Sequence, residues 1–280
     1  MRKTVLLLRM ILLMMFLVFL SINNNYVSLN EVEIRSTQSN LEIPVKVLHI
    51  SDLHGKLFST KQRKLTLMMD RLDYDVVVMT GDMIDKKTDD FMPVEFLLQY
   101  FQERGKPTFF ITGNHEGANP LYPEFQNLIE EYGVTTLDNQ KYTLNLENGQ
   151  SVSFVGLSDP NIVSFQESQP IVDELLSEAG EQTDTTILLS HRPTFMPHFT
   201  GKTDVILSGH SHGGQIRLPF IGGLISPGEG WFPKYDYGVF EETFVENNRQ
   251  TVMYVTKGMG NSIIPIRLFN SPEVAFLTIY

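Results

Sequence analysis

The hydrophobic and polar positions of this chain fall into three successive patterns. Met10–Leu20 is an unbroken apolar run, and Arg2, Lys3 and Arg9 precede it. After a polar triplet at residues 23–25, short apolar runs with the length of β-strands recur, and stretches with helical spacing separate several of them. Beyond residue 213, glycine, proline and aromatic residues dominate before three more strand-like segments. The middle pattern predicts layered α/β structure.

The apolar runs also predict where the individual elements lie. Strands are expected at residues 45–51, 76–80, 108–112, 151–157, 185–190, 205–208, 239–244, 251–256 and 274–280, and residues 27–34 form either a first strand or a linker. Helices are expected at residues 61–72, 91–104, 120–132 and 169–179. The third is expected to follow Asn119 as N-cap, and the fourth to have Pro170 in its first turn and to stop at Gly180. Glu147-Asn148-Gly149 predicts a hairpin turn between residues 141–146 and 151–157.

The N-terminal segment has the features of a membrane-targeting sequence. Its positive charges come first, which predicts that the start stays in the cytoplasm and the rest crosses the membrane. Phe19-Leu20-Ser21-Ile22-Asn23 is a poor match to the small-residue site that signal peptidase cleaves. We therefore favour an uncleaved anchor over a cleaved signal peptide that would release a secreted protein, or a buried core helix. We therefore expect an anchor or signal at residues 1–22, a linker or first strand at 23–44, and one domain at 45–280.

The composition of the chain limits its possible partners and the side chains that could catalyse a reaction or bind a metal. The chain carries 33 acidic and 22 basic residues, a net charge of −11, which disfavours binding to nucleic acid. It has no cysteine, so thiol catalysis, cysteine-ligated zinc and disulfides are excluded. Any metal must therefore be held by His, Asp, Glu or Asn side chains.

Polar residues gather where the predicted strands end. Because open α/β sheets bind ligands beyond the carboxyl ends of their strands, these residues are expected to converge on one site. Aspartate and neutral histidine are suitable ligands for Mn, Fe or Zn, and a carboxylate such as Asp82 can bridge two ions. The strand-end residues are Asp52, His54, Asp82, Asn114, His115, His191, His210 and His212, and they include five of the seven histidines.

These motifs, in this order, resemble those of the calcineurin-like metallophosphoesterases over about residues 47 to 215. The matching motifs are Asp52-x-His54, Gly81-Asp82, Gly113-Asn114-His115-Glu116, His191 and Gly209-His210-Ser211-His212. Further segments look like the bacterial membrane-associated or exported branch of that family: Gly213-Gly214-Gln215, Lys257-Gly258-Met259-Gly260-Asn261, Pro265-Ile266-Arg267 and Asn270-Ser271-Pro272-Glu273.

The resemblance implies a four-layer α/β/β/α sandwich with two divalent metal ions. It assigns the first ion to Asp52, His54, Asp82 and His212, and the second to Asp82, Asn114, His191 and His210. His115 would lie outside the ligand set and protonate the leaving oxygen or orient the phosphate. We expect a phosphodiesterase or phosphatase in which metal-activated hydroxide attacks phosphorus. Asn114 would offset phosphoryl charge, and Arg192 would either help it or form a salt bridge.

Two other functions deserve comparison. Gly209-His210-Ser211-His212-Gly213 matches the G-x-S-x-G pattern of serine hydrolases, but no histidine follows it in the chain, so we reject Ser211 as a nucleophile. A non-enzymatic, membrane-tethered metal-binding or ligand-binding module stays open, although it would have no need of His115 as a proton donor. We expect His49 to be a core histidine, and Asp85, Asp89 and Asp90 to form a solvated acidic loop.

The apolar segment at residues 218–227, with Trp231-Phe232 after it, has two interpretations. It packs over the sheet edge, or it forms an apolar lip beside the metals that suits a lipid-linked phosphate or docking on the bilayer. The sequence leaves open the substrate, the native metals, cleavage of the leader and the oligomeric state.

Overall fold

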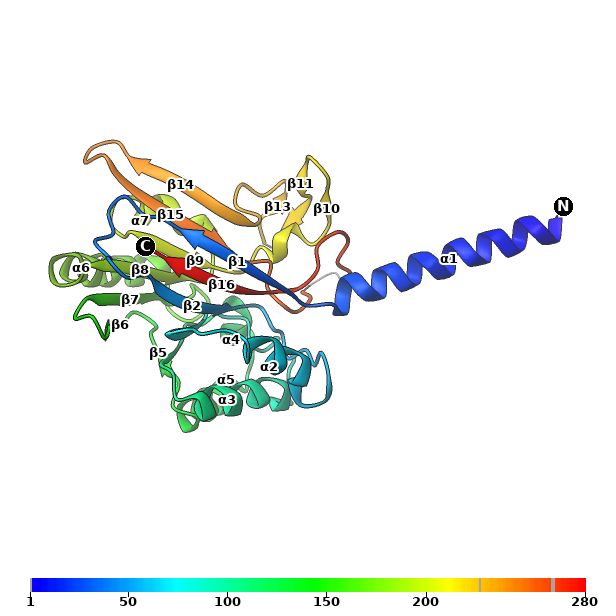
Figure 1. Cartoon of the computed structure of the whole chain (residues 1–280), viewed down its shortest axis with the longest axis horizontal. Coiled ribbons are helices and arrows are strands. Elements are labelled where there is room, and N and C mark those ends of the chain that lie inside the picture. Colours follow the sequence, from blue (N-terminus) through cyan, green and yellow to red (C-terminus); the bar gives the residue numbers. More distant parts are fainter. Residues whose placement is uncertain (1, 227, 263–264) are drawn as a thin grey trace.

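Two six-stranded sheets face each other at the centre of the domain (Figure 1). The computed structural model describes residues 2–226, 228–262 and 265–280. The first sheet has the order β1 (Ser28–Ile34), β16 (Glu273–Ile279), β2 (Val45–Ile50), β3 (Val76–Met79), β4 (Thr108–Phe110) and β5 (Thr135–Thr136). The second has the order β14 (Gly238–Phe244), β15 (Arg249–Val255), β9 (Val205–Ser208), β8 (Thr185–Ser190), β7 (Ser151–Leu157) and β6 (Lys141–Asn145).

The central strands are mainly apolar on both faces because both faces are buried. Along β2, Val45 and Val47 point into the core between the sheets, while Leu48 and Ile50 point to the helices on the other side. The same alternation holds along β3. Continuous apolar runs are therefore the expected sequence of these strands.

Helices form the two outer layers. The first sheet is covered by α2 (Arg63–Met69), α3 (Met92–Arg104) and α5 (Tyr122–Glu131), and the second by α6 (Phe165–Gln182) and α7 (Met196–Phe199). Shorter elements are η1 (Thr60–Gln62), α4 (Asn114–Ala118), η2 (Pro193–Phe195), η3 (His212–Gly214), and the hairpins β10 (Arg217–Leu218) with β11 (Gly222–Gly223) and β12 (Ile225–Ser226) with β13 (Gly230–Trp231). The predicted four-layer α/β/β/α sandwich is confirmed.

Two predicted helix starts are wrong. The N-cap of α5 is Leu121, and the Asn119 side chain instead closes a turn by accepting from Leu121 N at 2.8 Å. Helix α6 begins at Phe165 because Ser164 caps it, accepting from the backbone N–H of Glu167. Pro170 consequently lies inside α6, and the helix continues past Gly180.

Helix α1 (Arg2–Asn25) projects away from the domain (Figure 1). Its 24 residues correspond to a length of about 36 Å, which exceeds the roughly 30 Å hydrocarbon core of a bilayer. Among the residues described, it is the one helix long and apolar enough to cross a membrane, and none of its apolar window is buried, so a buried core helix is excluded. The helix also runs through the expected polar break, because the side-chain amides of Asn23, Asn24 and Asn25 donate to carbonyls one turn earlier.

Candidate metal centre

The strand-end residues meet at the seam between the two sheets. Asp52 and His54 follow β2, Asp82 follows β3, and Asn114 begins α4 after β4. From the second sheet, His191 follows β8, and His210 and His212 follow β9. Because β2, β3 and β4 run parallel, as do β7, β8 and β9, all these loops leave the sheets at one edge.

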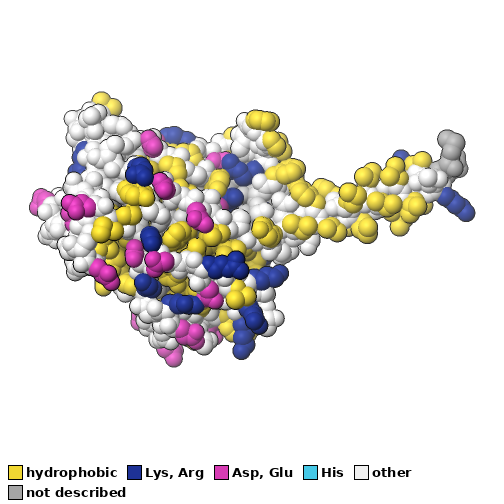
Figure 2. Space-filling model, in the orientation of Figure 1, with side chains coloured by type: hydrophobic (Ala, Val, Ile, Leu, Met, Phe, Trp, Pro, Cys, Tyr) yellow, Lys and Arg dark blue, Asp and Glu magenta, His cyan; other side chains and the backbone are white. Residues whose placement is uncertain are grey.

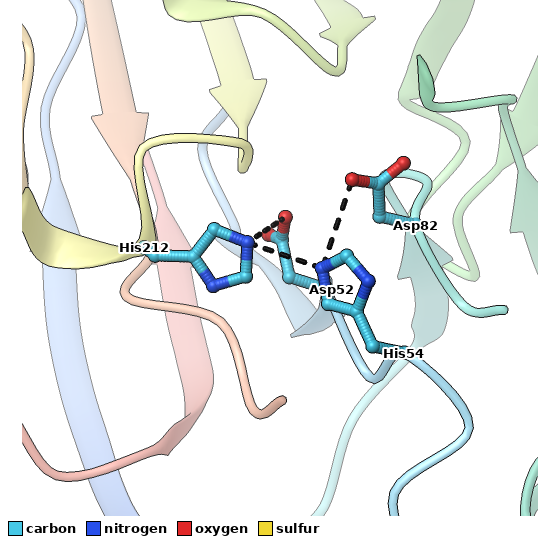
Figure 3. A group of neighbouring side chains, drawn as sticks. All are labelled: Asp52, His54, Asp82 and His212. Atoms are coloured by element: carbon cyan, nitrogen blue, oxygen red, sulfur yellow. Dashed lines mark hydrogen bonds and ion pairs between the residues drawn. The ribbon is translucent and has the colours of Figure 1, made fainter. Parts of the chain in front are cut away.

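The first group comprises Asp52, His54, Asp82 and His212, and their potential ligand atoms all lie within 4.8 Å of one another (Figure 3). His54 Nε2 lies 3.1 Å from His212 Nε2 and 3.7 Å from Asp82 Oδ2. His212 Nε2 lies 3.4 Å from Asp52 Oδ1. This is the set that the family resemblance assigned to the first ion.

The second group comprises Asp82, His191 and His210, again within 4.8 Å. His191 Nε2 lies 3.4 Å from Asp82 Oδ2, 3.2 Å from His210 Nδ1 and 3.3 Å from Asn114 Oδ1. Asp82 Oδ2 therefore faces both groups, so all seven residues come together as expected.

Backbone strain occurs at five of these residues. Asp52, His54, Asp82, His210 and His212 have φ values of 53°, 51°, 51°, 66° and 48°. Non-glycine residues in this left-handed region cost on the order of 1–3 kcal/mol each, and such strain clusters at functional sites. The loops are so close together here that position 209 requires glycine, because a Cβ on Gly209 would overlap Ser51 Oγ and Asp52 Oδ2.

Hydrogen bonds orient the candidate ligands. His191 Nδ1 donates to Thr80 O at 2.7 Å, which leaves Nε2 facing Asp82. Asp82 Oδ1 accepts from the backbone N–H of His115 at 2.8 Å, which leaves Oδ2 for the centre. The buried carboxylate of Glu116 accepts four backbone N–H groups, those of Asp82, Met83, Ile84 and Gly113.

The electrostatics favour a cation between the two sheets. Burial by itself would raise the pKa of Asp82, but the imidazoles of His191 and His54 outweigh it and hold that pKa well below its usual range. Burial likewise lowers the pKa of His191, while the Asp82 carboxylate more than offsets it and raises the pKa to about 10. Burial lowers the pKa of His210 to about 3, so this imidazole is neutral.

The donor set fits divalent metal ions. Both groups consist of aspartate and histidine side chains, which offer carboxylate oxygens and imidazole nitrogens as ligand atoms. The Nε2 atoms of His54 and His212 face each other, so either a shared proton or a metal ion must lie between their lone pairs. Such donors suit Mn, Fe and Zn, so the structure agrees with a pair of divalent cations without selecting the element.

The structure corrects our interpretation of Asp85. We expected a solvated acidic loop, yet Asp85 Oδ2 lies 3.0 Å from His115 Nδ1 and 3.7 Å from His54 Nδ1. The nearby imidazole of His54 lowers the pKa of Asp85 to about 2. His115 Nε2 points inward, 3.9 Å from Asp82 Oδ2. The position of Asp85, three residues after Asp82, is the signal that could have revealed this pairing.

Arg267 is a second residue whose place at the site we did not predict. Its guanidinium is buried and donates to the carbonyls of Lys257 and Gly260. Its Nη2 also lies 3.3 Å from His212 Nδ1. The local sequence could not signal this contact, because Arg267 is far from His212 in the chain.

Three further predicted side chains have clear partners. Arg192 forms a bidentate ion pair with buried Asp159, at 2.7 and 2.8 Å, which is the salt bridge that we held open. Ser211 is buried and its hydroxyl donates to Tyr235 O at 2.7 Å, as expected of a residue that is not a nucleophile. His49 is a buried core histidine, 2.8 Å from Thr80 Oγ1.

Comparison with known proteins agrees with this geometry. At the level of sequence, the chain is 28% identical to the uncharacterized metallophosphoesterase YkuE of Bacillus subtilis, over 84% of this chain and 78% of that protein. It is 28% identical to the uncharacterized metallophosphoesterase Cj0846 of Campylobacter jejuni, over 97% of this chain and 69% of that protein. It is also 28% identical to a bovine transmembrane protein with a metallophosphoesterase domain, over 83% of this chain and 52% of that protein.

Among solved structures, the 5'-nucleotidase precursor from Thermus thermophilus has the same fold. The TM-score is 0.53 at 12% sequence identity, and the match covers 78% of this chain and 49% of that one. The family model described as calcineurin-like phosphoesterase matches residues 45–214, which is more than half of the chain. Because this family consists of enzymes, the match excludes the alternative of a non-enzymatic binding module. The protein is a phosphoester hydrolase that belongs to the calcineurin-like phosphoesterase family.

Proposed function

We propose that this domain hydrolyses phosphate esters at a centre of two divalent cations. Asp52, His54, Asp82 and His212 would hold one cation, and Asp82, Asn114, His191 and His210 the other. The shared position of Asp82 carries the proposal: its Oδ2 lies 3.7 Å from His54 Nε2 and 3.4 Å from His191 Nε2. Two bound cations would generate hydroxide near neutral pH and offset charge on the phosphoryl oxygens.

His115 is proposed as the proton donor to the leaving oxygen. Its Nε2 faces the centre, while Nδ1 lies 3.0 Å from Asp85 Oδ2 and 3.3 Å from the backbone nitrogen of Lys86, and these two contacts fix the orientation of the ring. Burial lowers the pKa of His115, which makes its protonated form a stronger acid. General acid catalysis of this kind contributes about 10²–10⁴-fold to the rate.

Asn114 is proposed to assist at the phosphate. Because its Oδ1 faces His191, the Nδ2 end of the amide is the one that can donate to a phosphoryl oxygen. Arg192 is the weaker candidate for a phosphate contact, because two of its guanidinium nitrogens already donate to Asp159.

Substitution of His115 tests this assignment. We expect His115→Ala to retain the metal content of the wild type and to lose about 10²–10⁴-fold in kcat on an alkyl phosphodiester, whose leaving group needs a proton. The loss should be much smaller on bis(4-nitrophenyl) phosphate, whose leaving group does not. Asp85→Asn should move kcat in the same direction by less. The exposed residues His198 and Asp89 provide the controls His198→Ala and Asp89→Asn.

Metal analysis of the purified protein should accompany these rates. Asp52→Asn and His210→Ala are expected to lower the metal content, in contrast to His115→Ala. Full wild-type turnover after complete chelation would overturn the proposed centre. Full activity of His115→Ala on the alkyl ester would overturn only the role of His115.

We also propose that α1 is an uncleaved anchor that holds the domain outside the cytoplasm. Its length, its exposed apolar side chains and the leading Arg2 and Lys3 support this topology. A relative named as a transmembrane protein is consistent with it. The intact-protein mass from the membrane fraction is the test, because cleavage would remove residues of α1 and release the domain.

A further inference from the structure

Helix α1 leaves the domain at the edge that carries the candidate metal centre. It ends at Asn25, three residues before β1 begins at Ser28. Strand β1 runs parallel to β16, and β16 runs antiparallel to β2. The start of β1 therefore lies at the same edge as the end of β2, where Asp52 and His54 follow (Figure 1).

Polar contacts attach the last turn of α1 to this edge. Asn24 Oδ1 accepts from the backbone N–H of Arg267 at 3.0 Å and from Asn261 Nδ2 at 3.2 Å, and Asn24 O accepts from Lys56 Nζ. Since Arg267 also contacts His212, a single residue separates α1 from the proposed ligands. One turn earlier, the ring of Phe19 lies 5.2 Å from that of Phe269.

Large apolar side chains stand exposed beside this junction. The β10–β11 hairpin is tied to the segment that packs on α1, because Arg217 N donates to Leu268 O at 3.0 Å. Figure 2 shows hydrophobic atoms over this hairpin region and along α1. We call the exposed set the aromatic surface; its members are Phe220, Ile221, Trp231, Phe232 and Phe269, with exposed fractions of 109%, 60%, 71%, 64% and 56%.

The backbone of the aromatic surface is strained. Phe220, Phe232 and Phe269 have φ values of 66°, 54° and 52°, a region that bulky residues rarely occupy. Glycine or asparagine would make these turns at lower cost. Aromatic side chains held in solvent by a strained backbone indicate that they contact something outside the chain.

Charge near the junction favours an anionic partner. The chain as a whole is acidic, yet residues 53–69 contain four basic residues and no acidic one. Lys56 contacts α1, and Lys61, Arg63 and Lys64 are exposed on η1 and α2. Figure 2 shows lysine and arginine atoms gathered on this side of the domain, beside the base of α1. Basic residues next to a membrane helix attract anionic lipid head groups.

We infer that the edge carrying the candidate metal centre lies on the bilayer that α1 spans, with the aromatic surface inserted at the interface, and that the substrates are phosphate esters carried by membrane lipids. Phe269 lies at the level of Phe19, within the apolar part of α1, so the aromatic surface continues the membrane-facing helix. Tryptophan and other aromatic residues favour this interfacial depth. The inference rests on the proposed hydrolytic centre and on the anchoring of α1.

Trp231 reports directly on this contact because it is the chain's only tryptophan. The full-length protein is placed in vesicles of phosphatidylcholine and phosphatidylglycerol, with and without brominated acyl chains, and tryptophan fluorescence is measured. We expect strong quenching of Trp231 by the brominated lipids. The matched control is Trp231→Phe/Val245→Trp, because Val245 is 92% exposed in the β14–β15 turn, which lies at the opposite edge of the sheet.

Quenching at position 231 but not at position 245 supports the inference. Absence of quenching at both positions, or equal quenching at both, overturns it, because the domain then has no face held on the bilayer. An aromatic surface covered by a protein partner would also leave Trp231 unquenched in vesicles of lipid alone.

The substrate class is tested in the same vesicles with added Mn²⁺. The probe is a 4-nitrophenyl phosphodiester of diacylglycerol, and soluble bis(4-nitrophenyl) phosphate is measured in parallel. Phe220→Ser/Trp231→Ser should lower the ratio of lipid to soluble turnover by about tenfold or more, and Val245→Ser should not. Turnover of the soluble ester without turnover of the lipid ester overturns this inference alone. Failure on both esters counts against the proposed function itself.

Discussion

Glu116 is expected to hold together the loops that carry Asp82 and Asn114, and its amide variant Glu116→Gln isolates this role. The Glu116 side chain is fully buried. Its Oε2 accepts from Asp82 N at 2.8 Å and Gly113 N at 2.9 Å, and its Oε1 accepts from Met83 N and Ile84 N at 2.8 and 3.2 Å. Glutamine keeps the shape of the side chain but replaces one of these oxygens with an NH₂ group.

The expected loss follows from the two backbone N–H groups that the variant leaves without an acceptor. Each buried unsatisfied donor costs about 1–3 kcal/mol, so Glu116→Gln should lose roughly 2–6 kcal/mol of the free energy of unfolding. For a domain of this size, about 2–4 °C of Tm corresponds to 1 kcal/mol, which puts the fall in Tm at 4 °C or more. The Asp82 loop should also hold metal less tightly.

Thermal unfolding in EDTA, followed by circular dichroism, measures the loss of stability in the metal-free protein. Titration with Mn²⁺ measures the change in metal affinity. Glu174→Gln is the matched control, because Glu174 is exposed on α6 and its substitution should change stability by no more than about 0.5 kcal/mol. If Glu116→Gln and Glu174→Gln unfold at the same temperature, the four hydrogen bonds do not have the role that we assign to them.

Three further outcomes are expected. Arg192→Met should lower the free energy of unfolding by about 3–5 kcal/mol, because it leaves buried Asp159 without its ion-pair partner. The control is Arg249→Met, whose more exposed side chain lies 3.7 Å from Asp204 and whose loss should be under about 1 kcal/mol. Equal losses for the two variants in denaturant unfolding would contradict this prediction. Burial lowers the pKa of His49 to about 3, so the unfolded chain binds the proton first and stability is lost as the pH falls from about 6.5 towards 3. The stability gap between the wild type and His49→Gln should therefore narrow by about 2 kcal/mol between pH 7 and pH 5, and a gap that does not change with pH would refute the assignment. EDTA should abolish hydrolysis and lower the Tm, and Mn²⁺ should restore both, because a ligand that binds only the folded state stabilises it.

The local sequence was sufficient for the central strands and for the convergence of the candidate ligands on one edge. Val45–Ile50 and Val76–Met79 are mainly apolar because both faces of their sheet are buried. Strand-end residues such as Asp52 and Asp82 share an edge because their strands are parallel. Local patterning was less reliable at helix ends. The cap formed by Ser164 and Glu167 outweighs the helix-breaking tendency of Pro170, so α6 starts earlier than its apolar spacing suggests.

Pairing between distant segments decided the rest. Asp85 has the composition of a solvated loop, and only the approach of α4 brings His115 to within 3.0 Å of it. Arg267 meets His212, and α1 leaves beside the candidate metal centre, because the last strand, β16, inserts between β1 and β2. Hydrophobic periodicity records whether a position is buried, but it carries no information about which distant strand will lie next to it. The local sequence therefore specifies the candidate metal ligands. Only the folded sheet places these ligands at the edge from which α1 leaves.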